Sequence, residues 1–265
     1  MNKLKIVAQN LLQGMHLVDE VEKKKLFSKY WPSAYTEYYA KHKPDIVCFT
    51  EAPLDDKEGN SVFLDDFSEQ LKLPHYKVYV NDASWLVEGK YYGMAILSRY
   101  EIENYESFNL PNPRLEVDHA DGTHWIMHDK GAQKVTVEIG GKRINIFNLH
   151  YFPLFHFGRR IDEPEFHQIR ADLAEILRPK KGEISIVAGD FNNKDVDLEK
   201  AFPEIFEGEL LNTSVLFDGK EYPLYEGGET QLDHILYSEG LKFLGGTVES
   251  NFSDHVGLTT EFEIT

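Results

Sequence analysis

Side chains that could bind a metal ion or move a proton follow three short apolar runs of the sequence and precede a fourth. Asn10 ends the first run and Glu51 follows the second. The tetrad Gly-Asp-Phe-Asn (189–192) follows the third, and the tripeptide Ser-Asp-His (253–255) precedes the last. Carboxylate and amide oxygens are the hard ligands that Mg²⁺ or Mn²⁺ prefers in proteins. Glu51, with Asn10 and Asp254 nearby, therefore predicts a Mg²⁺ or Mn²⁺ site.

The tetrad at 189–192 can orient a water molecule and a phosphate oxygen together. Side chains alternate along an extended chain, so Asp190 and Asn192 are expected to point to one side while Phe191 points into the core. Gly189 allows the backbone to turn closely at the end of the strand. His255 adds a group that changes its charge near neutral pH. A single carboxylate at such a position is usually a turn former or a helix cap, so the interpretation depends on the order and joint presence of these groups.

The secondary structure that must position these residues is predicted to consist of many strands and a few helices. A helix is predicted to begin at Pro164 and end at Pro179, with its apolar side chains on one face, and others lie near residues 18–30, 33–42 and 62–72. Many strands and few helices favour two packed sheets flanked by helices. The β-type runs are rich in Val, Ile, Phe and Tyr; they cover residues 3–9, 45–50, 76–81, 93–98, 101–108, 132–139, 142–150, 184–189, 232–237, 242–249 and 256–264.

The polar motifs resemble those of the endonuclease/exonuclease/phosphatase superfamily, which includes deoxyribonuclease I, abasic-site endonucleases, neutral sphingomyelinases and inositol polyphosphate 5-phosphatases. They occur in the order typical of that superfamily and span residues 10 to 255. The resemblance implies an α/β (α+β) fold, a four-layer sandwich of two mainly antiparallel β-sheets flanked by helices, formed by residues 1–265 as a single domain. The matching pieces are Gln9-Asn10, Thr50-Glu51, Asn148-Leu149-His150, Gly189-Asp190-Phe191-Asn192, Leu232-Asp233-His234-Ile235 and Ser253-Asp254-His255.

The resemblance also implies which residues bind the metal ion. Glu51 is similar to the principal metal ligand of the superfamily, and Asn10 and Asp254 would complete or approach the same site. Thr50 departs from the commonest pattern, in which many members have Gln, but Glu51 itself is retained. The implied cofactor is Mg²⁺ or Mn²⁺.

Catalytic roles follow from the same resemblance. Asp190 would orient or deprotonate the attacking water, and Asn192 would hold both the water and the phosphate. Asp233 would pair with His255. His150 would contact the phosphate or the leaving group.

Two further segments are candidates for the substrate side of the site. The aromatic-rich stretch 151–160 ends in Arg159 and Arg160, which are predicted to bind a phosphate unless the stretch folds back on the core. The segment 118–129 holds three His and three Asp residues without a strand pattern, and it is expected to be a hydrogen-bonded loop rather than a zinc site. The run Lys130-Gly131-Ala132 resembles one in sphingomyelinase-like and inositol-phosphatase-like members.

Composition narrows the classes of partner. Lys+Arg 28 against Asp+Glu 45 gives a net charge of −17, which argues against a large non-specific DNA-binding surface but leaves room for a local basic patch.

Cys48 lies in an apolar run and is expected to be a buried hydrophobe. No run approaches the roughly 20 apolar residues of a membrane span, and no cleavable leader is visible, so a cytoplasmic location is expected. No protein partner is implied.

These observations predict a metal-dependent hydrolase that cleaves a phosphodiester by attack of an activated water, as a nuclease or a phosphodiesterase. Nucleic acid is one candidate substrate. The acidic charge keeps a small-molecule or lipid phosphoester as the alternative. A non-enzymatic alternative is a binding module without catalytic activity. That hypothesis would require the loss of one of the central polar groups.

Overall fold

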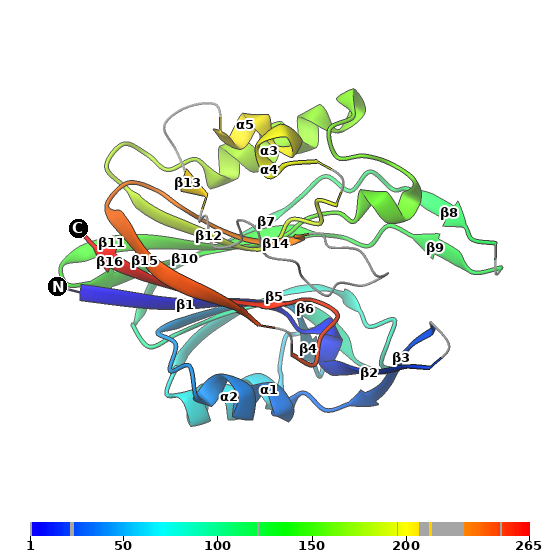
Figure 1. Ribbon diagram of the computed structural model, residues 1–265, viewed down its shortest axis with the longest axis horizontal. Helices are drawn as coiled ribbons and strands as arrows, with labels where there is room; N and C mark the ends of the chain where they lie inside the picture. The colour runs from blue at the N-terminus through cyan, green and yellow to red at the C-terminus, as the bar shows by residue number, and fades with distance from the viewer. Residues whose placement is uncertain are drawn as a thin grey trace.

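Two six-stranded sheets lie face to face at the centre of the structure, a computed structural model (Figure 1). It describes residues 2–21, 24–120, 122–194, 196–206, 212–213, 231–249 and 251–265, with the backbone alone for 17–28 and 212–213. The first sheet has the order β15-β16-β1-β4-β6-β5, with bounds Leu241–Glu249, Gly257–Ile264, Asn2–Asn10, Ile46–Leu54, Tyr91–Ser98 and His75–Ala83. The second has the order β13-β14-β12-β11-β10-β7, with bounds Asn212–Thr213, Asp233–Tyr237, Ile184–Asp190, Lys142–His150, Gly131–Ile139 and Ile102–Asn109.

Helices cover the outer face of each sheet and complete four layers. Helices α1 (Ser33–Ala40) and α2 (Val62–Leu71) pack on the first sheet, and α3 (His167–Leu177), α4 (Leu198–Ala201) and α5 (Pro203–Phe206) lie over the second (Figure 1). The predicted four-layer sandwich is confirmed. Among the described residues, no helix combines the length and apolar character that a membrane crossing requires.

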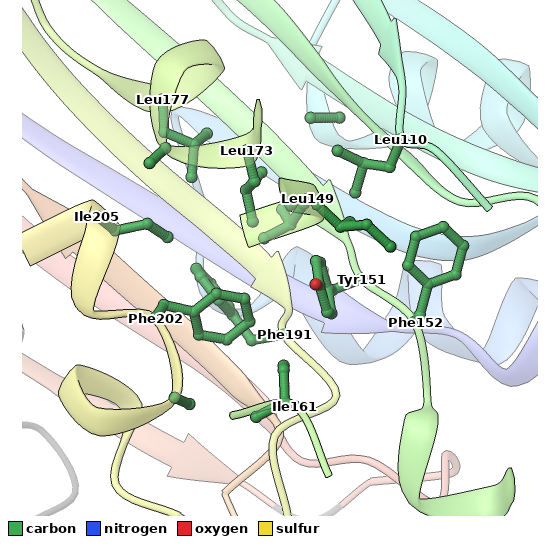
Figure 2. Close-up of a cluster of buried hydrophobic side chains, with 14 of the residues drawn as sticks. Leu110, Leu149, Tyr151, Phe152, Ile161, Leu173, Leu177, Phe191, Phe202 and Ile205 are labelled. Carbon is green, nitrogen blue, oxygen red and sulfur yellow. The ribbon is translucent and has the colours of Figure 1, made fainter. Parts of the chain in front are cut away.

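Three buried clusters hold the layers together because each sheet has two apolar faces. The cluster between the sheets joins Ile6 and Cys48 of the first sheet to Ile186 of the second, so Cys48 is a buried hydrophobe as expected. The cluster over the second sheet joins Leu149 and Phe191 to the helices, and Figure 2 shows them packed with Tyr151, Leu173 and Phe202. A third cluster lies under α1 and α2. Burial of this kind stabilises the fold by about 25 cal/mol per Å² of apolar surface.

Each sheet contains one parallel pair of strands at its centre, and the other described neighbours are antiparallel. Strands β1 and β4 run parallel, with Asn10 beside Thr50, and β11 and β12 run parallel, with His150 beside Asp190. Strand β14 begins antiparallel to the end of β12, which places Asp233 beside Asp190. The polar motifs of the sequence therefore gather at the carboxyl ends of the two parallel pairs.

All eleven predicted strands are present in these sheets, within a few residues of the predicted ends. The helices predicted at 33–42 and 62–72 are confirmed as α1 and α2. The helix predicted after Pro164 begins as the 3₁₀ turn η3 (Pro164–Phe166) and continues as α3. Helix α2 begins where predicted because the Ser61 hydroxyl accepts a hydrogen bond from the Leu64 amide at 3.2 Å.

The helix predicted over residues 18–30 is wrong. This segment forms an antiparallel hairpin of β2 (Met15–Val21) and β3 (Lys24–Tyr30). A helix over these residues would separate its ends by about 20 Å. Instead the Trp31 amide donates to the Gly14 carbonyl at 2.9 Å, and the His16 ring stacks on Trp31 at 5.6 Å. These contacts beyond the segment bring its two ends together and so exclude a helix.

Segment 118–129, expected to lack strands, contributes to a second hairpin, formed by β8 (Glu116–Asp118) and β9 (His124–Ile126). Its histidines point to different partners: His124 Nδ1 lies 2.9 Å from Asp118, and His128 Nδ1 lies 2.8 Å from Asp82. The His119 ring packs against Trp125. Asp121 lies outside the described residues. The geometry agrees with the expectation that side chains of this segment are hydrogen-bonded.

Candidate active site

A cleft of about 590 Å³ opens where the two parallel strand pairs end. Seven of the ten predicted site residues line it: Asn10, Glu51, His150, Asp190, Asn192, Asp254 and His255. Asp233 is buried directly behind His255 and bonds to it. Arg159 and Arg160 are not among the described residues that line the cleft.

Glu51 is placed by a bulge in β4. The register with β6 shifts between Phe49 and Ala52, and Glu51 itself has φ 47°, in the left-handed region that few non-glycine residues adopt. The bulge aims the carboxylate into the cleft, where Gln13 donates to it at 3.4 Å. Burial raises the pKa of Glu51, and the nearby Asp254 raises it further, although Lys130 opposes them. A carboxylate in this position gains from a neighbouring cation.

Lys130 lines the cleft and is a candidate that the sequence predictions did not include among the site residues. Its ammonium is buried and lies 2.8 Å from His150 Nε2. Burial lowers the pKa of Lys130, whereas Glu51 and Asp190 act to raise it. Burial and the Lys130 charge together hold the pKa of His150 well below its ordinary value, so His150 is a neutral imidazole. The run Lys130-Gly131-Ala132 was the sequence signal that could have identified this lysine.

Asp190 sits at the end of β12 in the centre of the cleft. Its Oδ1 accepts from the backbone amide of Asn192 at 2.8 Å, and its Oδ2 accepts from Asn10 Nδ2 at 3.2 Å. Burial raises the pKa of Asp190 to about 7; the nearby His255 opposes the rise, and Asp233 adds to it. A carboxyl group with such a pKa can both accept and release a proton at neutral pH.

The tetrad around Asp190 has the alternation that was expected. Phe191 is fully buried in the outer core (Figure 2). Asp190 and Asn192 line the cleft. Asn192 has φ 48°, and its side-chain amide donates to the Tyr151 carbonyl at 2.8 Å. Gly189 is required because a Cβ there would lie 2.1 Å from the Leu149 carbonyl oxygen.

Asp233 and His255 form a buried pair in which His255 Nδ1 lies 2.6 Å from Asp233 Oδ2. Burial by itself lowers the pKa of His255, but Asp233 and Asp190 outweigh it and raise the pKa well above its ordinary value. His255 is therefore an imidazolium at neutral pH. The Gln9 amide fixes the segment by donating to the His255 carbonyl at 3.3 Å, and the Tyr39 hydroxyl in turn donates to Gln9 at 2.7 Å.

Two groups of side chains could hold a metal ion. Asp190, Asp233 and His255 bring ligand atoms within 4.8 Å of one another. However, the ring N–H of His255 is engaged by Asp233, and a protonated imidazole is no ligand. Glu51, Asn10 and Asp254 all line the cleft and offer carboxylate and amide oxygens, the donors that suit Mg²⁺ or Mn²⁺.

The charge balance of the cleft also fits a divalent cation. The carboxylates of Glu51, Asp190 and Asp254 line it with Asp233 behind them, whereas Lys130 and His255 are the described cations whose charges act on Glu51 and Asp190. Buried charges of one sign are costly unless they are paired or bound to a metal. The residues present therefore fit Mg²⁺ or Mn²⁺ at Glu51, with Asn10 and Asp254 beside it.

The aromatic stretch 151–160 divides between the core and the cleft. Tyr151 and Phe152 are buried in the outer core, whereas the 3₁₀ turn η2 (Leu154–Phe157) places Phe155 and Phe157 on the cleft wall.

The two arginines that end this stretch bond to carboxylates: Arg159 to Glu163 and Glu165, and Arg160 to Asp162. Their phosphate-binding role stays a prediction. An unchanged KM in the Arg159→Ala and Arg160→Ala variants would contradict that role.

Solved structures share this fold over nearly the whole chain. An endonuclease/exonuclease/phosphatase from Beutenbergia cavernae has a TM-score of 0.71 at 14% identity, covering 100% of this chain and 72% of that one. The human Nocturnin catalytic domain has 0.63 at 19% identity, covering 99% and 95%. A mannosyl-6-phosphatase from Bacteroides thetaiotaomicron has 0.57 at 15% identity, covering 98% and 99%. At these identities the likeness shows the fold alone.

Comparison of sequences gives the family. None of the curated proteins compared with this sequence matches it. The model of the Endonuclease/Exonuclease/phosphatase family matches residues 13–255, which include every predicted site residue except Asn10. By this match over most of its length, the chain belongs to the endonuclease/exonuclease/phosphatase family.

Proposed function

We propose that the protein is a Mg²⁺- or Mn²⁺-dependent hydrolase that cleaves a phosphodiester by attack of an activated water. The observation that supports this best is the convergence of Glu51, Asp190 and the Asp233–His255 pair in one cleft. Members of the family hydrolyse phosphate esters, and the reaction class follows from membership. The phosphodiester, the metal dependence and the residue roles below are the proposed part.

Asp190 is the proposed general base. Its carboxylate is fixed by the Asn192 amide and by Asn10, and a pKa near 7 suits removal of a proton from water at neutral pH. Asn192 would hold the attacking water and a phosphate oxygen beside Asp190. The metal ion, when bound at Glu51, Asn10 and Asp254, would supply positive charge that polarises the phosphate.

His255 and Lys130 are the proposed cations of the protein itself. Asp233 fixes the His255 ring through Nδ1, which leaves Nε2 to donate to a phosphate oxygen or to protonate the leaving group. The Lys130 ammonium donates to the neutral His150 at Nε2, which lies 3.6 Å from Asp190, and so provides a second cation beside Asp190. Charge that develops on the phosphate would meet donors already in place, which lowers the barrier without reorganisation.

The alternative is a phosphatase or phosphodiesterase acting on a small-molecule or lipid phosphoester. It is supported by the net charge of −17, which disfavours a nucleic-acid polymer, and by the fold shared with a mannosyl-6-phosphatase. A catalytically silent module is disfavoured because none of the central polar groups is missing. We also propose a cytoplasmic location, since a single cysteine gives no sign of an oxidising compartment.

A substrate panel with Mg²⁺ or Mn²⁺ tests the proposal. The panel comprises bis(p-nitrophenyl) phosphate, single- and double-stranded DNA, abasic DNA, RNA, 5′-tyrosyl-DNA, sphingomyelin and inositol phosphates. We expect hydrolysis of a diester that a chelator abolishes and Asp190→Asn reduces by at least about 100-fold. Asp66→Asn, an exposed acid on α2, serves as the matched control. Hydrolysis of monoesters alone would favour the phosphatase, and no divalent-dependent hydrolysis of any member would contradict the proposal.

A further inference from the structure

The cleft has an apolar, aromatic mouth above its polar floor. Trp85 follows β5, Trp125 and Ile126 belong to β9, and Phe155 and Phe157 belong to η2; all five line the cleft. Three of the seven exposed large hydrophobic residues of the described chain are in this group: Trp85 is 50% exposed, Trp125 40% and Ile126 52%. Large apolar side chains in water are unfavourable unless something covers them, so their concentration at one site indicates a ligand.

The rings at this mouth lie close to the proposed reaction centre. The Trp85 ring centroid is 6.0 Å from the Lys130 ammonium, which itself contacts His150 at 2.8 Å. Trp85 is held in place by a stack on His128, at 5.1 Å and 25° between the planes. The Trp125 ring centroid lies 5.3 Å from that of His156, which also lines the cleft. A group attached to a phosphate on the floor would therefore reach the Trp85 ring directly.

The charges of the lining exclude a polyanion as the best ligand. Among the described lining residues, Lys130, Lys194 and the His255 imidazolium are the cations, and there is no arginine. A nucleic-acid strand or an inositol polyphosphate needs several cations to neutralise its phosphates, and this protein has a net charge of −17. A volume of about 590 Å³ is that of a small-molecule site. The ligand thus carries few phosphates and has a mostly uncharged body.

The side chains at the mouth of the cleft indicate which uncharged group the ligand carries. Indole faces stack on flat rings, and each stacked base contributes affinity without sequence preference. His124, His128 and His156 also line the cleft, and their flat rings, like the indoles, pack on an aromatic ring better than on an acyl chain. We infer that this cleft selects small phosphate esters that carry a flat aromatic group of nucleobase size, which stacks at Trp85 and Trp125. The inference rests on the proposed function and names its substrate class.

Paired ligands that differ only in the apolar group test the inference. Binding to the Asp190→Asn variant with Mg²⁺, which limits turnover, is measured by calorimetry for adenosine 5′-monophosphate, ribose 5-phosphate, phenyl phosphate and octyl phosphate. We expect adenosine 5′-monophosphate to bind about tenfold more tightly than ribose 5-phosphate. Phenyl phosphate should fall between them if a nucleobase is the preferred ring, and should equal the nucleotide if any aryl group suffices.

Variants of the two tryptophans locate the effect. Trp125→Ala and Trp85→Ala should each remove most of the preference for adenosine 5′-monophosphate and leave ribose 5-phosphate within about twofold. Trp125→Leu keeps an apolar side chain without a flat face and should behave like Trp125→Ala. Val62→Ala, an exposed apolar residue of α2 that is 67% exposed and does not line the cleft, is the control.

Two results would overturn the inference. The first is equal affinity for adenosine 5′-monophosphate and ribose 5-phosphate in the parent and the tryptophan variants. The second is that octyl phosphate binds most tightly of the four ligands and that Trp125→Leu binds it as tightly as the parent does. That result would assign the mouth to an alkyl chain. Failure of the inference is distinguishable from failure of the proposed function, because divalent-dependent hydrolysis of bis(p-nitrophenyl) phosphate by the wild-type protein reports the latter alone.

Discussion

Burial is what gives the individual acidic residues of this cleft their chemistry. A solvated carboxylate is ionised and unreactive as a base at neutral pH, whereas burial disfavours the charged form and raises the pKa. Burial raises the pKa of both Glu51 and Asp190, and Lys130 and His255 oppose the rise at each, but Lys130 is the stronger of the two cations at Glu51 and His255 is the stronger at Asp190. Two carboxylates of similar type can therefore serve as a metal ligand and as a proton acceptor.

The first prediction concerns Glu51. Glu51→Gln keeps the shape of the side chain but removes its charge, so the site loses its main anionic ligand. We expect the affinity for Mg²⁺ to fall by at least about tenfold and activity by at least about 100-fold. Calorimetric titration of Mg²⁺ measures the first effect. Glu69→Gln, an exposed acid on α2, is the control, and equal Mg²⁺ affinity in Glu51→Gln and wild type would contradict the assignment.

The second prediction is that Asp233 and His255 act as one unit. Their side chains lie 2.6 Å apart, and Asp233 raises the pKa of His255. Asp233→Asn and His255→Ala should each lower kcat by about 100-fold or more, and the double variant should be little worse than the worse single variant. Kinetics of the three folded variants complete the cycle. Purely additive losses would mean that the two residues work independently.

At the scale of elements, the site depends on two parallel strand pairs that end at the same edge of the sandwich. Asn148 links the two sheets behind the cleft, since its amide donates to the carbonyls of Phe49 at 2.7 Å and Ala95 at 3.2 Å. Hydrogen bonds buried between sheets fix their relative position, because a shifted sheet would leave polar groups unpaired. The site residues of β4 and those of β12 are thereby held in fixed positions relative to one another.

The third prediction belongs to β12. In Gly189→Ala the new Cβ would lie 2.1 Å from the Leu149 carbonyl oxygen of β11, so the strand end carrying Asp190 must move. We expect a loss of about 3 kcal/mol in the free energy of unfolding and a fall in activity. Denaturant titration measures the stability.

Gly245 in β15 supplies the matched control for this substitution. Its φ of +144° is close to the +136° of Gly189, but nothing lies within 4 Å of its Cβ position. Gly245→Ala therefore isolates the backbone strain from the clash and should cost only about 1 kcal/mol. Equal losses in the two variants would show that close packing against β11 is not the reason for Gly189.

At the scale of the whole molecule, a buried histidine is expected to make the stability of the fold depend on pH. His234 in β14 packs on Phe191 at 5.4 Å, and its Nε2 is buried without a partner among the described residues. Burial lowers the pKa of His234 to about 4. That residues 1–265 unfold as a single domain stays a prediction, and it is the condition under which one histidine affects the stability of the whole.

The fourth prediction follows from that pKa. In the unfolded chain the pKa of a histidine is about 6.5, so the unfolded state binds the proton first. The stabilising effect of a neutral His234 is complete above about pH 6.5 and is lost as the pH falls toward about 4. Between about pH 7.5 and about pH 5, His234→Gln should lose about 2 kcal/mol less than wild type in the free energy of unfolding. His167→Gln, an exposed histidine, is the control; equal pH slopes in all three proteins would refute the linkage.

The sequence by itself determined the elements that depend on local composition. Residues 142–150 form a run that contains Ile and Phe and ends in His150, and the strand predicted there has the bounds of β11. The alternation of side chains along the chain put Phe191 in the core and Asp190 in the cleft. The order of the polar motifs supplied the family and most of the site, because each motif is a few consecutive residues that can be read without knowing its neighbours in space.

Only the tertiary structure decided which of these residues meet and what surrounds them. The hairpin of β2 and β3 was missed because contacts outside the segment, between Gly14 and Trp31, join its ends. Lys130 joined the site because β10 pairs with β11 so that Gly131 lies beside His150. Strand pairing, burial and charge partners involve residues far apart in the chain, and local composition and periodicity carry no record of them.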